Sequence, residues 1–475
     1  MTPGEAPAVP GRHATMKQPF PMIPKRFFIE TFGCQMNEHD SEKIAGLLVH
    51  QGMLPAQSVE EADLFILNTC SVREKAAQKV YSRLGEVKGR KRQSAGFIIG
   101  VVGCVAQQEG REMVRRAPFV DLVVGTHMYH AIPDLLDQIQ GSGPHKIATD
   151  FLPEQAPVEI SPVVRQTNFR AAITIMEGCN KHCSFCIVPY TRGKERNRPA
   201  SIILEEVTRA GDLGFTELLL LGQTVNSYRD PENPRTRFAD LLAAAAQVPG
   251  IRRVRFTSPH PRSFDDRTIR VIGEIPTICD QVHLPLQSGS NRVLKRMRRQ
   301  HTREWYLQLT EKFQTTGRPI RFSTDMIVGF PGETEEDFEE TLQVVEQVQF
   351  ESMFSFKYSP RPFTEAVEWE DDVPEDVKAR RLMALQQMQR RIQMKLHRER
   401  YLGRVFTLLV EGPARDGTKR CGRTTTNKIV NYPGDEAAGT FVQVRITDVG
   451  PNSLVGERVP DTKGEQEDSW NANSR

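Results

Sequence analysis

The stretch Leu64-Phe-Ile-Leu-Asn-Thr-Cys70 is a nearly continuous apolar run that ends in a cysteine. Runs of this kind are typical of strands that are buried on both faces of a parallel sheet. Two other segments repeat the pattern, namely Phe27–Thr31 before Cys34 and Phe97–Val102 before Cys104. Stretches of helical period separate the three runs, at Ser41–His50 and Val72–Leu84. The alternation predicts an α/β domain with right-handed crossovers and a parallel sheet.

A cysteine follows each of these three predicted strands. Ligands of open α/β sheets bind at the edge where the carboxyl ends of the strands lie. We therefore expect Cys34, Cys70 and Cys104 to converge on one site. The alternative is three buried thiols, because cysteine packs well as a small hydrophobic side chain.

A second α/β segment runs from about Arg165 to Arg398, with helical stretches such as Leu204–Leu213 and Arg303–Thr315. Its six β/α units, with motifs at the strand ends, predict a (β/α)6 partial TIM barrel whose site lies at the carboxyl-terminal mouth. The candidate strands are Ala171–Met176, Leu218–Leu221, Arg253–Phe256, Val282–Leu286, Phe322–Val328 and Met353–Lys357.

The C-terminal part of the chain has a different character. Lys378–Arg404 is a helical stretch with nine Lys or Arg residues and one acid, Glu399. Three segments of β-forming residues follow it, and the Gly, Pro and Asn residues between them predict a small β-barrel. These segments are Val405–Val410, Thr424–Val430 and Phe441–Ile446.

With 475 residues, the chain is too long for one ordinary domain. Its 38% of hydrophobic residues can give each domain a core, which excludes a disordered protein. The net charge of +3 indicates no class of partner. No apolar run reaches the ~18 residues of a membrane span, so we expect a cytoplasmic protein. We divide it into a flexible tail at 1–24, domains at 25–142, 165–398 and 399–462, a linker at 143–164, and a disordered tail at 463–475.

The motif Cys179-Asn-Lys-His-Cys183-Ser-Phe-Cys186 carries the strongest chemical signal. Three thiolates in so short a segment can hold three irons of a four-iron cluster, and the fourth iron can then bind a substrate or cofactor. A structural zinc site that uses His182 is the alternative. Such a site normally closes with a second ligand pair, and the sequence contains no second CxxC pair.

This motif, with Phe185 before its last cysteine, resembles that of radical S-adenosylmethionine enzymes. The resemblance implies that the open iron binds S-adenosylmethionine, whose reductive cleavage gives methionine and a 5′-deoxyadenosyl radical. It also implies cofactor contacts at other strand ends. The first candidates are Gly222 and Gln223 after the second strand, where the family usually has Gly-Gly-Glu. The others are Gln287 and Ser288 after the fourth strand, and Ile327 and Gly329 beside the adenine of the cofactor. The glycine-rich stretch can also be an ordinary turn before a helix at Thr334.

Motifs over about Lys25 to Glu457 resemble methylthiotransferases, above all the tRNA enzymes that make 2-methylthio-N6-isopentenyladenosine. In that family, cysteines at the positions of Cys34, Cys70 and Cys104 hold an auxiliary four-iron cluster, and a small barrel called TRAM binds RNA. The motifs are Thr31-Phe-Gly-Cys-Gln-Met-Asn37, Asn68-Thr-Cys-Ser-Val-Arg-Glu74, Gly103-Cys-Val-Ala-Gln-Gln108, Val188-Pro-Tyr-Thr-Arg-Gly-Lys-Glu195, Leu284-Pro-Leu-Gln-Ser-Gly-Ser290 and Tyr358-Ser-Pro-Arg-Pro362.

The resemblance implies methylthiolation of C2 of N6-isopentenyladenosine, next to the tRNA anticodon, with two [4Fe-4S] clusters. No ordinary base removes the hydrogen on this carbon, which is why a radical is needed. One S-adenosylmethionine methylates a sulfur on the auxiliary cluster, and a second yields the radical. We further expect a flavodoxin- or ferredoxin-like electron donor, a sulfur donor and a monomeric enzyme.

Three features favour RNA binding: the small barrel, the basic stretch Lys378–Arg404, and the group Lys295-Arg-Met-Arg-Arg299 with Arg303. Positive patches attract phosphate without reading sequence, although a basic helix is often only a solvated face. Arg192 and Lys194 can meet a carboxylate or phosphate, or can be solvated surface charges.

Two other substrates fit the same plan: threonylcarbamoyl-adenosine in tRNA, and an aspartate of a ribosomal protein. The stretch Asn68–Lys79 and the Gln-Met-Asn after Cys34 favour the isopentenyl-adenosine branch by resemblance. A protein of another class, an RNA-associated iron–sulfur electron carrier, needs no open cluster irons. The two sets of three cysteines argue against it.

Overall fold

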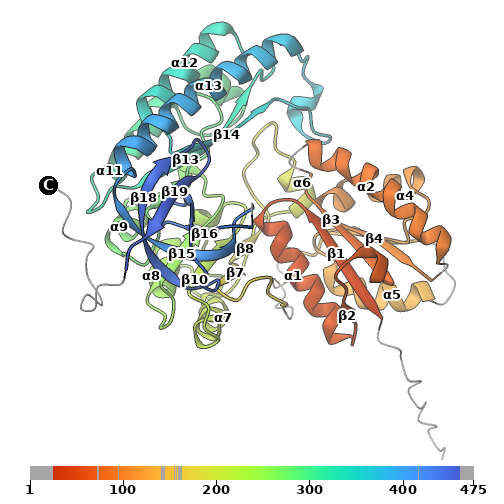
Figure 1. Ribbon diagram of the computed structural model, residues 1–475. Coiled ribbons are helices and arrows are strands. Elements are labelled where there is room, and N and C mark those ends of the chain that lie inside the picture. Colours follow the sequence, from red (N-terminus) through yellow and green to blue (C-terminus); the bar gives the residue numbers. More distant parts are fainter. Residues whose placement is uncertain are drawn as a thin grey trace, which may run out of the picture.

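The computed structural model describes residues 25–460, except for 72–73, 95, 141–144, 155, 157, 159–162 and 416. Figure 1 shows an N-terminal unit (red to orange) beside a central unit (green to cyan), with a small barrel (blue) against the central unit. The tails predicted at 1–24 and 463–475 lie outside the described residues. Within the described part of the chain, no helix is long and apolar enough to cross a membrane.

The N-terminal unit contains the parallel sheet that the apolar runs predict, in the order β2-β1-β3-β4-β5-β6. One face packs against α1 (Gln35–His50) and α5 (Ile132–Gln140). The other face packs against α2 (Glu74–Gln93), α3 (Cys104–Glu109) and α4 (Arg111–Arg116). The strands are β1 (Arg26–Phe32), β2 (Leu54–Pro55), β3 (Leu64–Thr69), β4 (Ile98–Gly103), β5 (Leu122–Val124) and β6 (Lys146–Ala148).

The register of this sheet aligns the strand ends that carry the cysteines. Thr69, the last residue of β3, pairs with Phe32 of β1 and with Gly103 of β4. Cys70 and Cys104 follow their strands directly, and Cys34 stands just before α1. The three cysteines therefore leave the sheet at one edge, because parallel strands end on the same side.

The central unit is an arc of parallel strands, in two sheets of three strands each, β7-β10-β11 and β12-β13-β14. A parallel bridge links Val254 of β11 to Ile278, in the segment that leads into β12, and so connects the two sheets. The strand order follows the sequence, so the arc has the arrangement of the predicted partial barrel. The strands are β7 (Arg170–Thr174), β10 (Glu217–Leu221), β11 (Arg253–Phe256), β12 (Gln281–His283), β13 (Arg321–Val328) and β14 (Ser352–Lys357).

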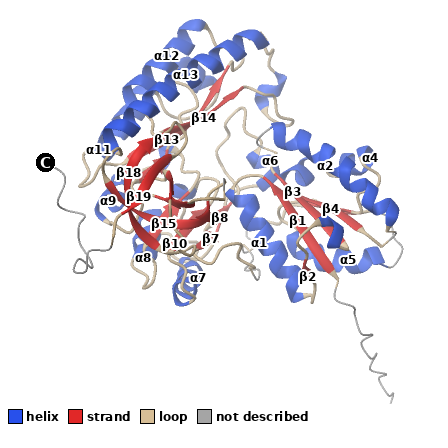
Figure 2. Cartoon of the chain, viewed as in Figure 1, coloured by secondary structure: helices blue, strands red, loops and turns tan. Residues whose placement is uncertain are grey.

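Helices lie outside this arc, as Figure 2 shows by colour. They are α7 (Ala200–Asp212), α8 (Phe238–Ala246), α9 (Asp266–Glu274), α10 (Asn291–Arg296), α11 (Arg303–Gln314), α12 (Glu335–Val348) and α13 (Glu375–Arg400). A short helix, α6 (Val188–Arg192), follows the core cysteine motif, between the two short antiparallel strands β8 (Met176–Glu177) and β9 (Arg196–Asn197).

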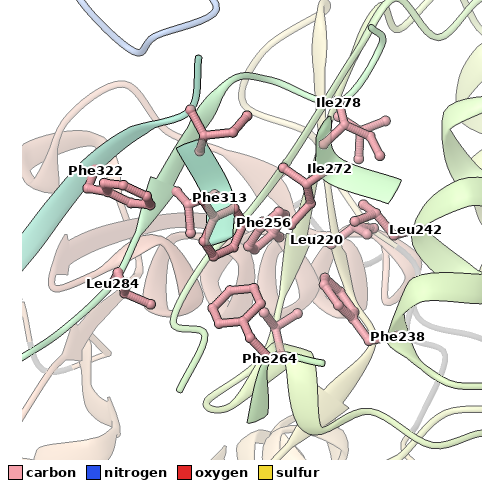
Figure 3. Packing of buried hydrophobic residues seen from close by; sticks show 14 of the residues in the cluster. Leu220, Phe238, Leu242, Phe256, Phe264, Ile272, Ile278, Leu284, Phe313 and Phe322 are labelled. Atoms are coloured by element: carbon pink, nitrogen blue, oxygen red, sulfur yellow. The ribbon is translucent and has the colours of Figure 1, made fainter. Parts of the chain in front are cut away.

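The core of the central unit joins its strands to its helices through aromatic side chains (Figure 3). Phe313 of α11 makes edge-to-face contacts with Phe264 and with Phe322 of β13, at centroid distances of 5.2 and 5.6 Å. Phe238 of α8 contacts Phe256 of β11 in the same way, at 5.3 Å. Edge-to-face pairs add directional attraction to the burial of apolar surface, so they fix how the helices lie on the arc.

The C-terminal strands close into a barrel in the order β15-β16-β17-β19-β18. One prediction is wrong here: Thr424–Val430 is not one strand but the turn between β16 and β17 and the first residues of β17. The Thr424 hydroxyl accepts the backbone N–H of Lys428, and Asn427 adopts a left-handed φ of 66°. Threonine favours strands, but its hydroxyl can also stabilise turns. The strands are β15 (Val405–Pro413), β16 (Arg420–Arg423), β17 (Ile429–Tyr432), β18 (Phe441–Val449) and β19 (Leu454–Arg458).

Buried arginines of β11 dock this barrel onto the central unit. Arg255 donates to the carbonyls of Thr424 (2.6 Å) and Thr425 (3.0 Å), and it pairs with Glu217 of β10 at 3.0 Å. Arg253 donates to the carbonyls of Thr407 and Arg423. The docking therefore depends on charge-assisted hydrogen bonds to the backbone of the barrel.

We predict that Arg255→Leu weakens the docking of the barrel onto the central unit. The substitution removes these hydrogen bonds and takes one of its partner cations away from the buried Glu217 carboxylate. Breaking a buried ion pair costs about 3–5 kcal/mol. Limited proteolysis should release a fragment that begins near residue 400 faster than in the unchanged protein, and the melting temperature should fall. Arg270→Leu, at an exposed position of α9, is the matched control. Equal proteolysis rates for the two variants would contradict this account of docking.

Candidate active site

The auxiliary cysteines meet at the carboxyl edge of the N-terminal sheet. A hydrogen bond with Cys70, together with the charge of Arg192, lowers the pKa of the Cys34 thiol to about 6. Burial raises the pKa of the Cys104 thiol, which lies within electrostatic reach of Cys34 and Arg192. The three thiols predicted to converge therefore lie at one place.

A network of buried amides shapes this edge. The Asn68 side-chain amide donates to the carbonyl of Asn37 at 2.8 Å and to the Ser41 hydroxyl at 2.9 Å, and Asn37 donates back to Asn68 at 3.1 Å. Gly103 has a φ of 91°, and a Cβ there would lie 2.4 Å from the Asn68 side chain. These residues are in the motifs around the cysteines, but their shaping role was not predicted. Two asparagines within three residues of a predicted cluster cysteine were the available signal.

The core cysteines lie in the loop between β8 and α6. Burial raises the pKa of Cys179 to about 11 and that of Cys186 to about 12, and the charge of the Cys183 thiolate contributes to both increases. The loop is held at Ser184, whose N–H donates to the Met297 carbonyl at 3.2 Å and whose hydroxyl donates to the Arg296 carbonyl at 2.8 Å. These contacts fix the cysteine loop against the C-terminal end of α10.

Arg299 lies directly at the core cysteines. It is 5% exposed, and its guanidinium donates to the Cys183 sulfur at 3.4 Å and to the Pro285 carbonyl at 2.8 Å. The sequence placed it in a basic group for RNA, and this is wrong for Arg299 because its charge faces a thiol inside the protein. Within the same group, Arg298 is exposed and pairs with Glu365 at 2.7 Å.

The chemistry of both cysteine sets fits an iron–sulfur cluster, because cysteine thiolates are the usual ligands of its irons. A zinc ion binds each ligand at about 2.0–2.3 Å, which requires the ligands to crowd together. Among the described residues, no group of three or more His, Cys, Asp or Glu is placed to hold one ion. The His182 side chain is exposed. A four-iron cluster instead distributes its thiolates over separate irons, and each set would leave one iron without a cysteine.

Several of the predicted cofactor contacts lie close to one another. Phe185 and Ile327 belong to one apolar group with Phe330, Tyr358 and Trp369. The backbone of Gln287 bridges to β13, since its N–H donates to the Asp325 carbonyl and its carbonyl accepts the N–H of Ile327, both at 2.9 Å. Gln287 has a left-handed φ of 80°. The motifs after the fourth and fifth strands of the arc are thus hydrogen-bonded to each other.

The remaining candidates differ in what they can offer a ligand. A Cβ at Gly222 would lie 2.5 Å from Met176, and one at Gly329 would lie 2.3 Å from Lys378, so both positions require glycine. The side-chain amide oxygen Oε1 of Gln223 is buried and has no hydrogen-bond partner in the described structure. The Ser288 hydroxyl accepts the N–H of Ser290 at 3.2 Å, which assigns it to the loop itself.

Of the two interpretations of Arg192 and Lys194, contact with an anionic group holds for Arg192 and solvated surface charge holds for Lys194. Arg192 is 4% exposed and pairs with Asp40 at 2.6 Å, so it meets a carboxylate. Lys194 is a solvated charge that pairs with Glu154 at the surface. The turn of Gly329 does lead to a helix: Thr334 and Asp337 form a capping box at the start of α12.

Three family models match successive parts of the chain. They are the uncharacterized protein family UPF0004 at 26–125, the radical SAM superfamily at 173–345 and the TRAM domain at 399–459. A relative from Koribacter versatilis, named tRNA-2-methylthio-N(6)-dimethylallyladenosine synthase, is 46% identical over 92% of this chain and 98% of its own. One of the same name from Carboxydothermus hydrogenoformans is 44% identical over 90% and 98%. The chain belongs to this family.

These matches confirm the family resemblance and the fold class predicted from the sequence. They also confirm the prediction that the chain is a radical S-adenosylmethionine enzyme. Among solved structures, the radical S-adenosylmethionine methyltransferase TsrM from Kitasatospora setae matches with a TM-score of 0.54. The match covers 73% of this chain and 77% of that one at 12% identity, so it supports the fold alone.

We predict that Arg299→Leu weakens retention of iron at the core cysteines, because it removes a charge-assisted bond to a thiolate. Such a bond is worth about 1.5–3 kcal/mol, which corresponds to about tenfold or more in retention. The measurement is the concentration of chelator that removes half of the iron from a Cys34→Ala, Cys70→Ala, Cys104→Ala protein. Arg298→Leu is the control, and equal iron retention in both variants would contradict the prediction.

Proposed function

We propose that the chain methylthiolates C2 of N6-dimethylallyladenosine in tRNA, the product class for which its relatives are named. The observation that carries the proposal is the pair of three-cysteine groups, one at the edge of the N-terminal sheet and one in the loop between β8 and α6. Three thiolates would leave one iron of a four-iron cluster without a cysteine. An enzyme that transfers sulfur and also generates a radical needs two such centres. An electron carrier needs neither open site.

In this proposal, Cys179, Cys183 and Cys186 hold the [4Fe-4S] cluster to which S-adenosylmethionine binds. Cys34, Cys70 and Cys104 hold the auxiliary [4Fe-4S] cluster. When bound, the clusters and S-adenosylmethionine supply the one-electron and methyl-transfer chemistry that side chains lack. The protein positions these groups and excludes water.

The loops at the mouth have separate roles toward the cofactor. Phe185 and Ile327 supply an apolar surface for its adenine ring. Gly222 and Gly329 keep the backbone free of side chains where the loops turn. Gln223 offers a buried amide oxygen that no described group satisfies, and unpaired buried acceptors are costly without a ligand. Gln287 and Ser288 hold the adjoining loop in place.

For tRNA, five of the eight Lys and Arg residues of α13 already pair with carboxylates of the protein. Lys378 pairs with Asp371, Arg381 with Glu333, and Arg400 with Glu351. Arg390, Lys395 and Arg398 remain exposed on the same helix, which leads directly into the barrel. We assign phosphate contacts to these three residues together with the exposed cations of the barrel.

Other partners follow from the reaction. It consumes electrons and sulfur, so we propose a flavodoxin- or ferredoxin-like reductant and a separate sulfur donor, with a monomeric enzyme in the cytoplasm. Threonylcarbamoyl-adenosine and ribosomal-protein aspartate are not favoured, since the relatives are named for dimethylallyladenosine.

The experiment is anaerobic. We would reconstitute the clusters, add reductant, S-adenosylmethionine and tRNA that carries N6-dimethylallyladenosine, and analyse the digested nucleosides by mass spectrometry. We expect a 2-methylthio product, its loss to background in Cys70→Ala and Cys183→Ala, and continued cofactor cleavage in Cys70→Ala only. Cys421→Ala is the control, because that thiol lies on β16 away from both sites. Full product formation by Cys70→Ala would refute the two-site proposal.

The salt dependence of tRNA affinity should show whether the exposed cations of α13 contact phosphates. Neutralising Arg390, Lys395 and Arg398 to Gln should reduce the slope of log affinity against log salt by up to about 0.7–0.9 for each phosphate that the variant no longer neutralises. Filter binding at several salt concentrations measures the slope. Arg391→Gln, on the same helix but paired with Glu346, is the control. An unchanged slope in the triple variant would move the RNA surface away from α13.

A further inference from the structure

Helix α6 connects the two cysteine sites through the backbone. It begins two residues after Cys186 and ends at Arg192, a span of about 7 Å at 1.5 Å per residue. The far end is anchored in the N-terminal unit. The Thr126 hydroxyl donates to the Thr191 carbonyl at 2.6 Å, and His127 donates through Nε2 to the Arg192 carbonyl at 2.9 Å.

The tautomer of His127 supports this anchor. Its Nδ1 accepts the backbone N–H of Leu152 at 3.2 Å, so the other ring nitrogen carries the proton that Arg192 accepts on its carbonyl. Burial lowers the pKa of His127, which keeps the ring neutral. The end of α6 is therefore fixed by two side chains of the other unit.

The side chain of Arg192 enters the N-terminal unit. Its Nη2 lies 2.6 Å from Asp40 Oδ2, on the helix that starts beside Cys34. The Tyr129 hydroxyl donates to the same oxygen at 3.1 Å. Helix α6 packs against α3, which begins at Cys104, and the charge of the guanidinium acts to lower the pKa values of the Cys34 and Cys104 thiols. A cation at the end of α6, the helix that follows the core cysteine loop, is thus part of the surroundings of the auxiliary cysteines.

An ion pair that merely joins two units does not need this burial. Charged pairs in the interior pay a large desolvation cost, and those at an exposed rim contribute little in either direction. Arg192 and Asp40 are 4% and 0% exposed, and the second oxygen of Asp40 has no hydrogen-bond partner in the described structure. Thiolates that hold a cluster are anionic, and Asp40 adds a further negative charge beside them. The fixed positive charge of Arg192 offsets this negative charge.

We propose that Arg192 is the positioning residue of the auxiliary site: held by Asp40, it places one positive charge against the Cys34 and Cys104 sulfurs and raises the reduction potential of the cluster there. The inference rests on the proposed function, since it takes these cysteines as cluster ligands. Because Arg192 ends α6, any shift of the core cysteine loop moves this charge. The core site therefore sets the potential of the auxiliary site through one short helix.

The test isolates the auxiliary cluster in a Cys179→Ala, Cys183→Ala, Cys186→Ala protein and measures its reduction potential by redox titration followed by electron paramagnetic resonance. Net charge and hydrogen bonds to the sulfurs set such potentials. Arg192→Gln should make reduction harder by about tenfold in the one-electron equilibrium, which is about 59 mV. Asp40→Asn should shift the potential in the opposite direction, and Arg192→Lys should lie near the parent.

Lys194→Gln is the matched control, since this cation lies two residues further along the chain and is exposed. The double variant Arg192→Gln, Asp40→Asn removes both charges and serves where Arg192→Gln alone fails to fold; it should return toward the parent potential. If the parent binds no four-iron cluster, the auxiliary site is wrong and the inference fails with it. If the parent binds one and Asp40→Asn titrates at its potential, as does Arg192→Gln where that variant folds, the inference alone is overturned.

Discussion

Parallel pairing of β1, β3 and β4 is the constraint on which the auxiliary site depends. The register that sets Thr69 beside Phe32 and Gly103 brings three cysteines, far apart along the chain, to one edge of the sheet. A slip of one residue in β3 would turn Cys70 to the other side, since side chains alternate along a strand. The buried amides of Asn37 and Asn68 hold that edge, and Gly103 leaves room for them. Fold and chemistry are therefore joined at the level of strand register.

Buried arginines recur wherever two parts of this molecule must keep a fixed relation. Arg255 docks the small barrel, Arg299 touches the core cysteine loop, and Arg192 connects that loop to the auxiliary site. Each is nearly excluded from solvent and donates to a fixed acceptor. The planar guanidinium suits this use because its donors point in fixed directions and its charge is never lost. In a radical S-adenosylmethionine enzyme of this family, such rigidity keeps reactive groups in place and away from water.

The sequence predicted the fold where local patterns were strong. Five of the six central strands differ from their predicted bounds by at most two residues at either end, and β11 agrees at both ends; β12 ends at His283, short of the predicted Leu286. The short strands β2, β5 and β6 went unpredicted because two or three residues carry little pattern. Long-range partners could not be predicted: Arg192 meets Asp40 and Arg299 meets Cys183 only after the units fold. The strand predicted at Thr424–Val430 was wrong because residues with strand propensity form a turn there. The domain bounds and the ligand role of each cysteine remain predictions.

The central claim is that this chain holds two separate clusters, each with three cysteines and one open iron, joined by α6. The most direct measurement is an anaerobic crystal structure of the reconstituted protein with S-adenosylmethionine, in which anomalous scattering locates the iron. The account predicts two iron sites, with three thiolates from Cys34, Cys70 and Cys104 at one and three from Cys179, Cys183 and Cys186 at the other. S-adenosylmethionine should lie on the second, and Arg192 beside the first. A single iron site, or a fourth protein ligand that closes either cluster, would contradict it.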